Sequence, residues 1–315
     1  MTSLFATYAI EPEVFEDWHN VRLLLSDLGW DEGRLVATVP EATYRDKIKA
    51  ALQRSRDSTK AHIAGAELKR RLRSSWVSAP RNTWFSPDRD WLEEVEHYHQ
   101  SNERFRAVIA SDNPRERGFV VTASELSDLH EDWQVSRGVE VDRHPEELAH
   151  VLAPLLKQGP KITLVDPHFD PCKRKFREFL AAIMSRAVDR PDEHNPSVEF
   201  IYHSRACDQP GDDPDPPRSE FPQYARRHLI QLIPDGCELT LKRWRERTGT
   251  DFHDRFIMNS DGGVKIGAGL SKQSSDGEKA NVLLLDQALF RAKKNKFRQK
   301  SSPLELIDST TLPAE

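Results

Sequence analysis

The sequence predicts an α/β protein of two domains, and three observations support this. In the C-terminal half, short runs of β-branched and apolar residues alternate with runs of helical spacing. Strands separated by helices are typical of a sheet covered by helices. The 315 residues are enough for two ordinary domains, and no internal repeat divides them. We therefore predict a mixed α/β N-terminal domain over residues 1–142 and a second α/β domain over residues 143–315.

The hydrophobic pattern predicts the elements of the C-terminal domain in order. A buried strand is predicted at 161–166, where apolar and β-branched residues precede a proline. Helical spacing follows at 173–188, and alternation predicts a second strand at 197–203. The pattern then predicts a helix at 221–233, strands at 237–244 and 281–285, and a closing helix at 287–300.

The first 140 residues have a weaker pattern. Helices are predicted at 15–28 and 41–73, and strands at 106–110 and 118–122. Six of the seven tryptophans lie in this part of the chain. The pattern indicates a separate folded domain but does not indicate its function.

The charge balance excludes a protein that is basic overall. There are 46 lysines and arginines against 51 aspartates and glutamates, which leaves a net charge of −5. A nucleic-acid surface must therefore be a local patch. One candidate is the basic run at 41–73, and the other follows residue 290, where the candidate phosphate-binding residues are Lys293, Lys294, Lys296 and Arg298. Either run is also compatible with a solvated helix face.

The sequence predicts a cytoplasmic protein without a membrane partner. No secretory signal is recognisable at its start, and no apolar run reaches the length of about 18 residues that a membrane helix needs. The three cysteines have no metal-like spacing, and their odd number argues against a disulfide framework.

A short hairpin is predicted at 252–271, with a turn at Asp261–Gly263. On its first strand His253 and Arg255 are two residues apart, so their side chains are expected on the same side. A nucleophilic imidazole beside a fixed positive charge is what attack on a phosphodiester requires. The hairpin is therefore the candidate catalytic segment.

This hairpin resembles the His-x-Lys…Asp…Gly-Ser element of the phospholipase D superfamily, and 164–171 resembles the early Val-Asp-Pro-Tyr-Phe strand of that family. The resemblance covers roughly residues 146–297. It implies a phospholipase D-like sheet flanked by helices and phosphodiesterase activity through a covalent phosphohistidine. It also implies that no cofactor or metal ion is needed.

The resemblance assigns roles residue by residue. His253 matches the nucleophile and Arg255 takes the place of the lysine, while Ser271 substitutes for the serine that Ala268 replaces. The supporting residues are Asp166, His168, Asp261 and Glu278.

A single copy of the element implies that two chains complete the site, because the family uses a second histidine to protonate the leaving oxygen. A homodimer or a subunit of a multiprotein defence complex is therefore expected. Single-copy members of the family include nucleases and restriction-type endonucleases, so nucleic acid is the expected partner, DNA before RNA. A role in bacterial anti-phage defence or restriction is expected by analogy.

Three alternatives remain open from the sequence. The replaced lysine and serine are also compatible with a catalytically degenerate subunit that binds nucleic acid or serves as a scaffold. Asp166, His168 and Asp170, together with His253 and Asp254, could hold a divalent metal ion. Hydrolysis of lipid headgroups is a weaker alternative, because no amphipathic membrane-surface helix is evident.

Overall fold

The computed structural model describes residues 4–39, 41–55, 71, 76–78, 89–102, 105–127, 129–189, 197–203, 217, 219–247, 252–271, 277–297 and 302–313. The chain divides into two compact units, residues 1–137 and 138–315. The division precedes the strand Gly138–Asp142, whereas the sequence analysis placed it after that strand. The reason is that this strand pairs with a strand of the C-terminal sheet. None of the described helices is long and apolar enough to cross a lipid bilayer.

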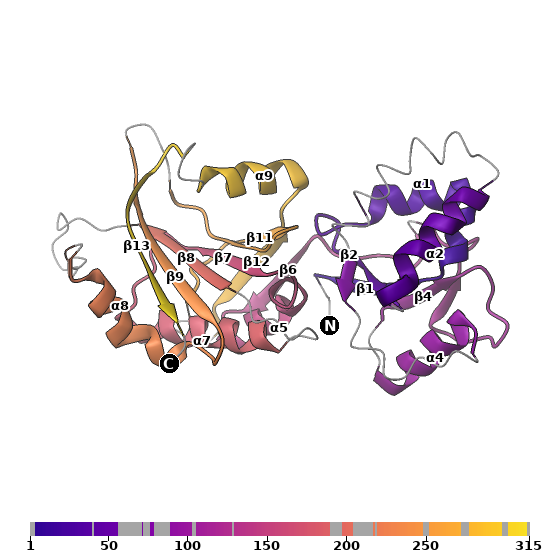
Figure 1. Ribbon diagram of the computed structural model, residues 1–315, viewed down its shortest axis with the longest axis horizontal. Helices are drawn as coiled ribbons and strands as arrows, with labels where there is room; N and C mark the ends of the chain where they lie inside the picture. Colours follow the sequence, from indigo (N-terminus) through magenta and orange to yellow (C-terminus); the bar gives the residue numbers. More distant parts are fainter. Residues whose placement is uncertain are drawn as a thin grey trace. The chain divides into compact units, whose positions relative to one another are not determined.

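The N-terminal unit contains a five-stranded sheet that is parallel throughout, with the strand order β3-β2-β1-β4-β5. Figure 1 labels β1, β2 and β4 of this sheet. Its strands are β1 (Ala6–Ile10), β2 (Arg34–Thr38), β3 (Trp76–Ser78), β4 (Ala107–Ala110) and β5 (Val120–Thr122). Its helices are η1 (Pro12–Glu16), α1 (Trp18–Asp27), α2 (Glu41–Arg54) and α4 (Trp91–Asn102).

Buried aromatic residues join the elements of this unit. The hydroxyl of Tyr8 on β1 donates a hydrogen bond to the carbonyl of Asp132 at 2.8 Å, and the indole of Trp133 donates to Asp27 on α1 at 2.8 Å. The strands β4 and β5 and the helices α1 and α2 lie within the predicted segments. Most of the predicted helix beyond Arg54 lies outside the described residues, and β1, β2 and β3 were not predicted.

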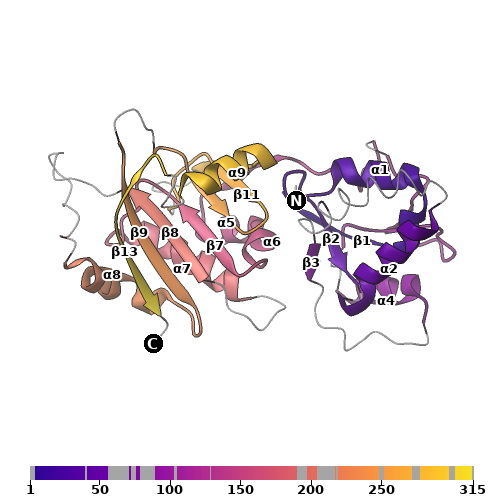
Figure 2. The same cartoon turned by 45° about the horizontal axis from the view of Figure 1, so that its top comes forward.

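The C-terminal unit contains an eight-stranded mixed sheet of order β13-β9-β8-β7-β10-β11-β12-β6. Neighbours are parallel from β7 to β9 and antiparallel elsewhere (Figure 2). Its strands are β6 (Gly138–Asp142), β7 (Lys161–Val165), β8 (Ser197–His203), β9 (Glu238–Arg245), β10 (Phe256–Met258), β11 (Gly263–Ile266), β12 (Lys279–Leu284) and β13 (Glu305–Pro313). Its helices are α5 (Pro145–Val151), α6 (Ala153–Leu156), α7 (Arg174–Val188), α8 (Phe221–Leu229), η2 (Ile230–Leu232) and α9 (Gln287–Lys296).

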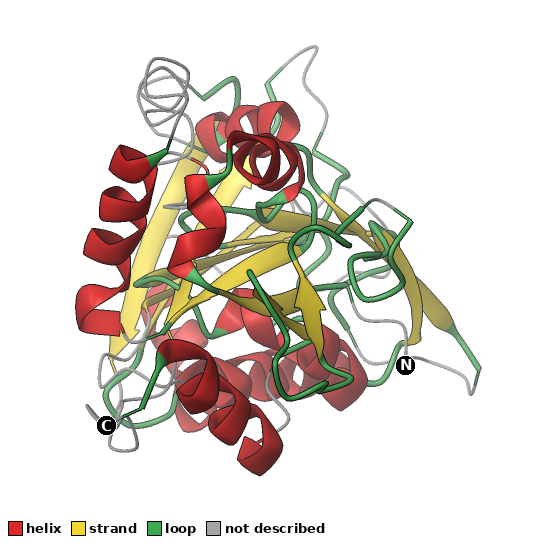
Figure 3. Cartoon of the chain, turned by 90° about the vertical axis from the view of Figure 1, so that its right-hand side faces the viewer, coloured by secondary structure: helices red, strands yellow, loops and turns green. Residues whose placement is uncertain are grey.

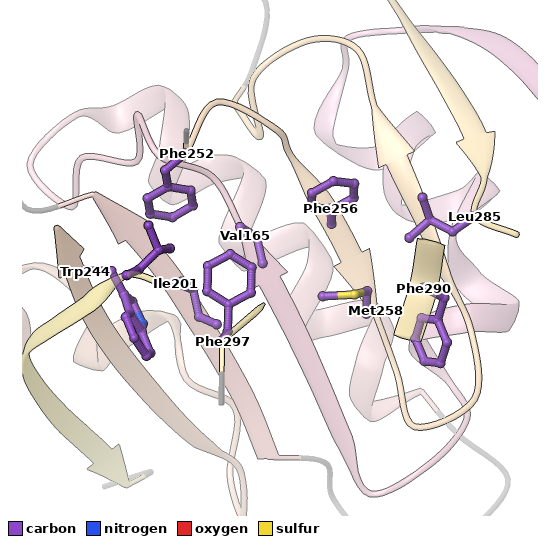
Figure 4. Close-up of a cluster of buried hydrophobic side chains, with 10 residues drawn as sticks. Val165, Ile201, Trp244, Phe252, Phe256, Met258, Leu285, Phe290 and Phe297 are labelled. Carbon is purple, nitrogen blue, oxygen red and sulfur yellow. The ribbon is translucent and has the colours of Figure 1, made fainter. Parts of the chain in front are cut away.

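Helices cover both faces of this sheet (Figure 1). Figure 3 distinguishes the helices, strands and loops of the chain by colour. The helix α9 covers one face, where the buried cluster of Figure 4 joins it to β7, β8, β9 and β10. The cluster consists of Val165, Ile201, Trp244, Phe252, Phe256, Met258, Leu285, Phe290, Phe297 and Leu304. The helices α5 and α7 lie on the other face, and α7 buries Phe179, Leu180 and Ile183 there. The α/β layer is thus the one that the sequence predicted.

A buried ion pair holds the edge strand β13 on β9. Arg243 is 2% exposed and Asp308 is 7% exposed, and Nε of Arg243 donates to Oδ1 of Asp308 at 2.7 Å. A second hydrogen bond joins the same two side chains. The hydrophobic pattern does not indicate β13, which is rich in polar residues and is recognised only through its pairing with β9.

We expect Asp308→Ala to destabilise the protein by about 3–5 kcal/mol, because it leaves the charge of Arg243 buried without a partner. The matched control is Glu305→Ala on the same strand, which removes a pair with Arg245 whose side chains are 57% and 46% exposed. The control is expected to cost less than about 1 kcal/mol. Urea unfolding of both variants measures the difference, and equal losses would contradict the prediction.

Candidate functional site

Five strand ends of the C-terminal sheet meet at one edge. Because β10 is antiparallel to β7 and to β11, its start lies beside the ends of both. In the same way the start of β12 lies at the edge where β11 and β6 end. Side chains that follow β6, β7 and β11 or precede β10 and β12 therefore share this edge. They include Arg143, Asp166, His168, His253, Arg255, Ser271 and Glu278.

Asp166 lies at the centre of this edge and is fully buried. Its Oδ1 accepts the backbone N–H of His168 at 2.8 Å, and its Oδ2 accepts that of Leu270 at 2.6 Å. Nε of Arg255 lies 3.6 Å from Oδ1. Burial raises the pKa of Asp166, whereas the two backbone N–H groups and the Arg255 guanidinium act in the opposite direction. The carboxylate thus connects the end of β7 with the start of β10 and with the segment after β11.

His253 and Arg255 precede β10, whereas the sequence analysis placed them within the strand. Their side chains nevertheless lie on the same side. Arg255 faces Asp166, and the ring of His253 lies beside that of His168, with centroids 6.4 Å apart and planes inclined by 19°. Asp254 between them contacts Lys265 and Lys293 at 2.8 and 2.7 Å. The imidazole of His253 and the guanidinium of Arg255 therefore lie towards Asp166 and His168, whereas the carboxylate of Asp254 lies towards Lys265 and Lys293.

Arg143 brings Ser271 and Glu278 into the site. One guanidinium nitrogen donates to Oε2 of Glu278 at 2.6 Å, and another donates to Oγ of Ser271 at 3.0 Å. A Cβ built on Gly269 would lie 3.7 Å from both the Arg143 guanidinium and the Asp166 carboxylate. The backbone of Gly269 is therefore bordered by both groups, with no side chain of its own between them.

Two guanidinium donors at this edge have no acceptor. Nε of Arg143 and Nε of Arg255 are buried, and within the described part of the chain neither makes a hydrogen bond. A buried donor without an acceptor costs about 1–3 kcal/mol. Nε1 of Trp244 is a further buried donor of this kind among the described residues of the unit, so the feature is not confined to this edge.

Arg143 is a candidate site residue that the sequence analysis missed. It follows β6, a strand that was not predicted, and the surrounding residues were interpreted as a domain boundary. The pairing of β6 with β12 places Arg143 beside Glu278, and its backbone N–H donates to the carbonyl of Glu278 at 2.9 Å. No local sequence pattern indicates this contact across the sheet.

Asp261 lies at the other end of the hairpin from Arg255. Asn259 holds this turn, because its Oδ1 accepts the backbone N–H groups of Asp261 and Gly262 at 2.9 Å each. The side chain of Asp261 accepts a hydrogen bond from Ser260. The strand β10 separates the two ends by about 10 Å at an ordinary strand rise. The structure thus places Asp261 in the turn and not beside the supporting residues Asp166 and His168.

The lysines of α9 contact the hairpin. Lys293 pairs with Asp254, and Nζ of Lys294 donates to the carbonyl of Ser260 at 2.7 Å. Lys296 lies on the same helix and is half-buried, whereas Arg298 lies outside the described residues. Their role in binding phosphate stays a prediction.

The alternative metal ligands do not gather in the part of the chain that the structure describes, where no three histidine, cysteine, aspartate or glutamate side chains form a cluster. Oδ1 of Asp170 accepts the backbone N–H of Cys172 at 3.0 Å, and Asp254 pairs with two lysines. Both carboxylates are therefore engaged away from Asp166.

No family model and no curated protein matches the chain. Among solved structures, one similar chain is that of TrmBL2, an archaeal chromatin protein whose structure is described as showing a novel mode of DNA binding. It is 14% identical, with a TM-score of 0.26, and the match covers 55% of this chain and 54% of that chain. The chain thus matches about half the length of that protein.

We expect the ion pairs of Asp254 to make the free energy of unfolding fall more steeply as the pH is lowered. Lys265 and Lys293 lower the pKa of Asp254 to about 2, below the value of 3.8 for an unperturbed aspartate. The lowered pKa stabilises the fold above about pH 4, and this contribution is lost as the pH falls towards 2. Asp254→Asn should therefore flatten the acid limb of the stability curve, while costing about 1 kcal/mol at neutral pH because water partly screens both lysine pairs.

Urea unfolding at a series of pH values between 7 and about 2 measures this effect. The control is Asp142→Asn, which changes an exposed carboxylate of the same unit. Parallel curves for wild type and Asp254→Asn would contradict the prediction.

Proposed function

We propose that the chain is a phospholipase D-like phosphodiesterase, a nuclease that needs no metal ion and uses His253 as its nucleophile. The observation that carries the proposal is that the exposed imidazole of His253 lies two residues from Arg255, at the sheet edge where the guanidinium groups of Arg255 and Arg143 are held by carboxylates. An imidazole nitrogen attacks phosphorus, while the cations neutralise the negative charge of the phosphoryl oxygens. The phospholipase D-like form of the sheet is part of the proposal.

Arg255 and Arg143 bind the phosphoryl group in this proposal. Arg255 lies 3.6 Å from Asp166, and Arg143 lies 2.6 Å from Glu278, so each cation is held by a carboxylate. Ser271 is 2% exposed and its hydroxyl accepts from Arg143. Ser271 therefore acts by positioning Arg143, and Arg143 takes the contact with phosphate that Ser271 would make in place of the family's serine.

Nucleic acid is the proposed substrate, DNA before RNA. The support is the resemblance of the His253 segment to single-copy nucleases. Guanidinium groups also suit a phosphate backbone, because they form planar, bidentate hydrogen bonds to its oxygens. The net charge of −5 confines such contacts to this edge and to local basic surfaces.

The first test is cleavage of single- and double-stranded DNA and RNA in the presence of EDTA. Wild type is expected to cleave DNA, and His253→Ala is expected to lose the activity while still binding. The control is His150→Ala, which removes an exposed histidine on α5 and should leave cleavage unchanged. Cleavage that EDTA abolishes would overturn the metal-independent mechanism.

The second candidate function is a catalytically degenerate subunit that binds nucleic acid. The burial of Ser271 favours it, because the hydroxyl is not presented to a ligand. This candidate predicts binding by wild type and no cleavage of any of the four substrates. The same experiment therefore separates the two functions.

We expect Arg143→Ala to weaken binding of a short fluorescent DNA oligonucleotide by about tenfold or more, because a charged hydrogen bond contributes about 1.5–3 kcal/mol. The salt dependence of binding should also become shallower, since one phosphate contact is lost. Fluorescence anisotropy at several salt concentrations measures both effects.

The matched control for Arg143 is Arg174→Ala on α7, whose side chain is 84% exposed and pairs with Glu178 on the same helix. It should bind as wild type does. Equal affinities for Arg143→Ala and wild type would contradict the role of Arg143.

A further inference from the structure

A second histidine of the same chain lies beside His253. His168 follows β7, and both rings are exposed and nearly parallel, with their centroids 6.4 Å apart. Phosphoryl transfer needs entering and leaving groups on opposite sides of phosphorus. The nucleophile therefore contacts phosphorus from one side, and the acid contacts the leaving oxygen on the other side, at a hydrogen-bond distance of about 2.6–3.2 Å. Two imidazoles in these roles must be several ångströms apart, and the two rings, with centroids 6.4 Å apart, are close without being in direct contact.

The backbone of His168 is held by contacts of its own N–H group and of the next residue in the sequence. Its backbone N–H donates to Oδ1 of Asp166 at 2.8 Å. The next residue, Phe169, is fully buried and stacks on Phe200 of β8 with a centroid distance of 3.9 Å. Asp166 thus contacts both the backbone of His168 and the guanidinium of Arg255. The backbone from which the His168 side chain projects is therefore held by buried neighbours, and this fixes where the imidazole can reach.

We propose that His168 is the general acid and base of this site, so that both histidines of the reaction come from one chain. The inference rests on the proposed function. In the first step neutral His253 forms an N–P bond, the bond from phosphorus to the leaving oxygen breaks, and protonated His168 gives its proton to that oxygen. In the second step His168 takes a proton from water, the water oxygen bonds to phosphorus, and the N–P bond breaks. The products are an alcohol and a phosphomonoester, and both histidines return to their initial states.

This arrangement differs from the one that the motif count predicted. With one copy of the His-x-Lys element, the sequence analysis expected a second chain to supply the second histidine. His168 belongs to no such element, yet its position at the end of β7 places it beside His253. A homodimer is then unnecessary for the chemistry, whatever other role it has.

Two substrates whose leaving groups differ in their need for a proton test the role of His168. An oligonucleotide releases a sugar alkoxide, which needs a proton, whereas bis(p-nitrophenyl) phosphate releases a phenolate that leaves without one. His168→Ala is expected to lower oligonucleotide cleavage by about 10²–10⁴-fold. With the p-nitrophenyl ester it should release a burst of about one phenolate per chain, followed by slow turnover, because only the second step lacks its base. Intact-protein mass spectrometry should then detect the phosphorylated chain.

The outcomes separate this inference from the proposed function. His253→Ala should lose activity on both substrates and form no phosphorylated chain, and His150→Ala should behave as wild type. If His168→Ala cleaves the oligonucleotide as wild type does, or loses both substrates equally without a burst, the role of His168 is overturned while the nuclease stands. If wild type cleaves neither substrate, the proposed function fails and this inference fails with it.

Mixing the two variants tests whether one chain supplies both histidines. A mixture of His253→Ala and His168→Ala should remain inactive on the oligonucleotide if each site is built from one chain. Recovery of activity on mixing would show that the two histidines act across chains, and it would overturn the inference. Because His168 is exposed, its variant should unfold at the same temperature as wild type.

Discussion

The carboxylate of Asp166 holds together three segments that are far apart in the sequence. It accepts the backbone N–H of His168, two residues away, and that of Leu270, 104 residues away, and it lies against the guanidinium of Arg255. Because this carboxylate is fully buried, each partner offsets part of the cost of removing its charge from water. The loss of one partner would therefore change the strength of the remaining hydrogen bonds and of the ion pair to the same carboxylate. The end of β7, the start of β10 and the segment after β11 therefore depend on one group.

The mixed sheet is what allows so many segments to reach that group. In the parallel sheet of the N-terminal unit, the C-terminal ends of all strands lie at one edge and their N-terminal ends at the opposite edge. In the C-terminal sheet, antiparallel neighbours bring the starts of β10 and β12 to the edge where β6, β7 and β11 end. Side chains of consecutive residues alternate in direction, so the three residues 253–255 make contacts on two sides of the chain. His253 and Arg255 face the site, while Asp254 pairs with Lys265 and with Lys293 of α9.

The sequence indicated the parts of this arrangement that have a local signal. The strand β7 is a run of apolar and β-branched residues, and apolar residues recur at alternate positions of β8 and in the first half of β9. The proximity of His253 to Arg255 follows from their spacing in the sequence. The strands β6 and β13 were not predicted, because each is recognised through pairing with a distant strand rather than through its own composition. Arg143 was missed for the same reason. The closeness of His168 to His253 likewise depends on the antiparallel pairing of β7 with β10, which the hydrophobic pattern does not specify.

The arginines of the C-terminal unit also differ in a way that bears on function. Arg243 is buried beside Asp308, makes two hydrogen bonds to that carboxylate, and lies over the ring of Phe221 at 4.0 Å. Arg143 and Arg255 contact carboxylates as well, yet each keeps a buried Nε that makes no hydrogen bond to any described residue. Among the described residues of this unit, Nε1 of Trp244 is a further buried donor without a hydrogen bond, so such atoms are not confined to this edge. What distinguishes Arg143 and Arg255 is that Glu278 and Asp166 hold their guanidinium groups at the edge where five strands begin or end. Two fixed cations at one edge are the physical support for the proposal that phosphate is bound there.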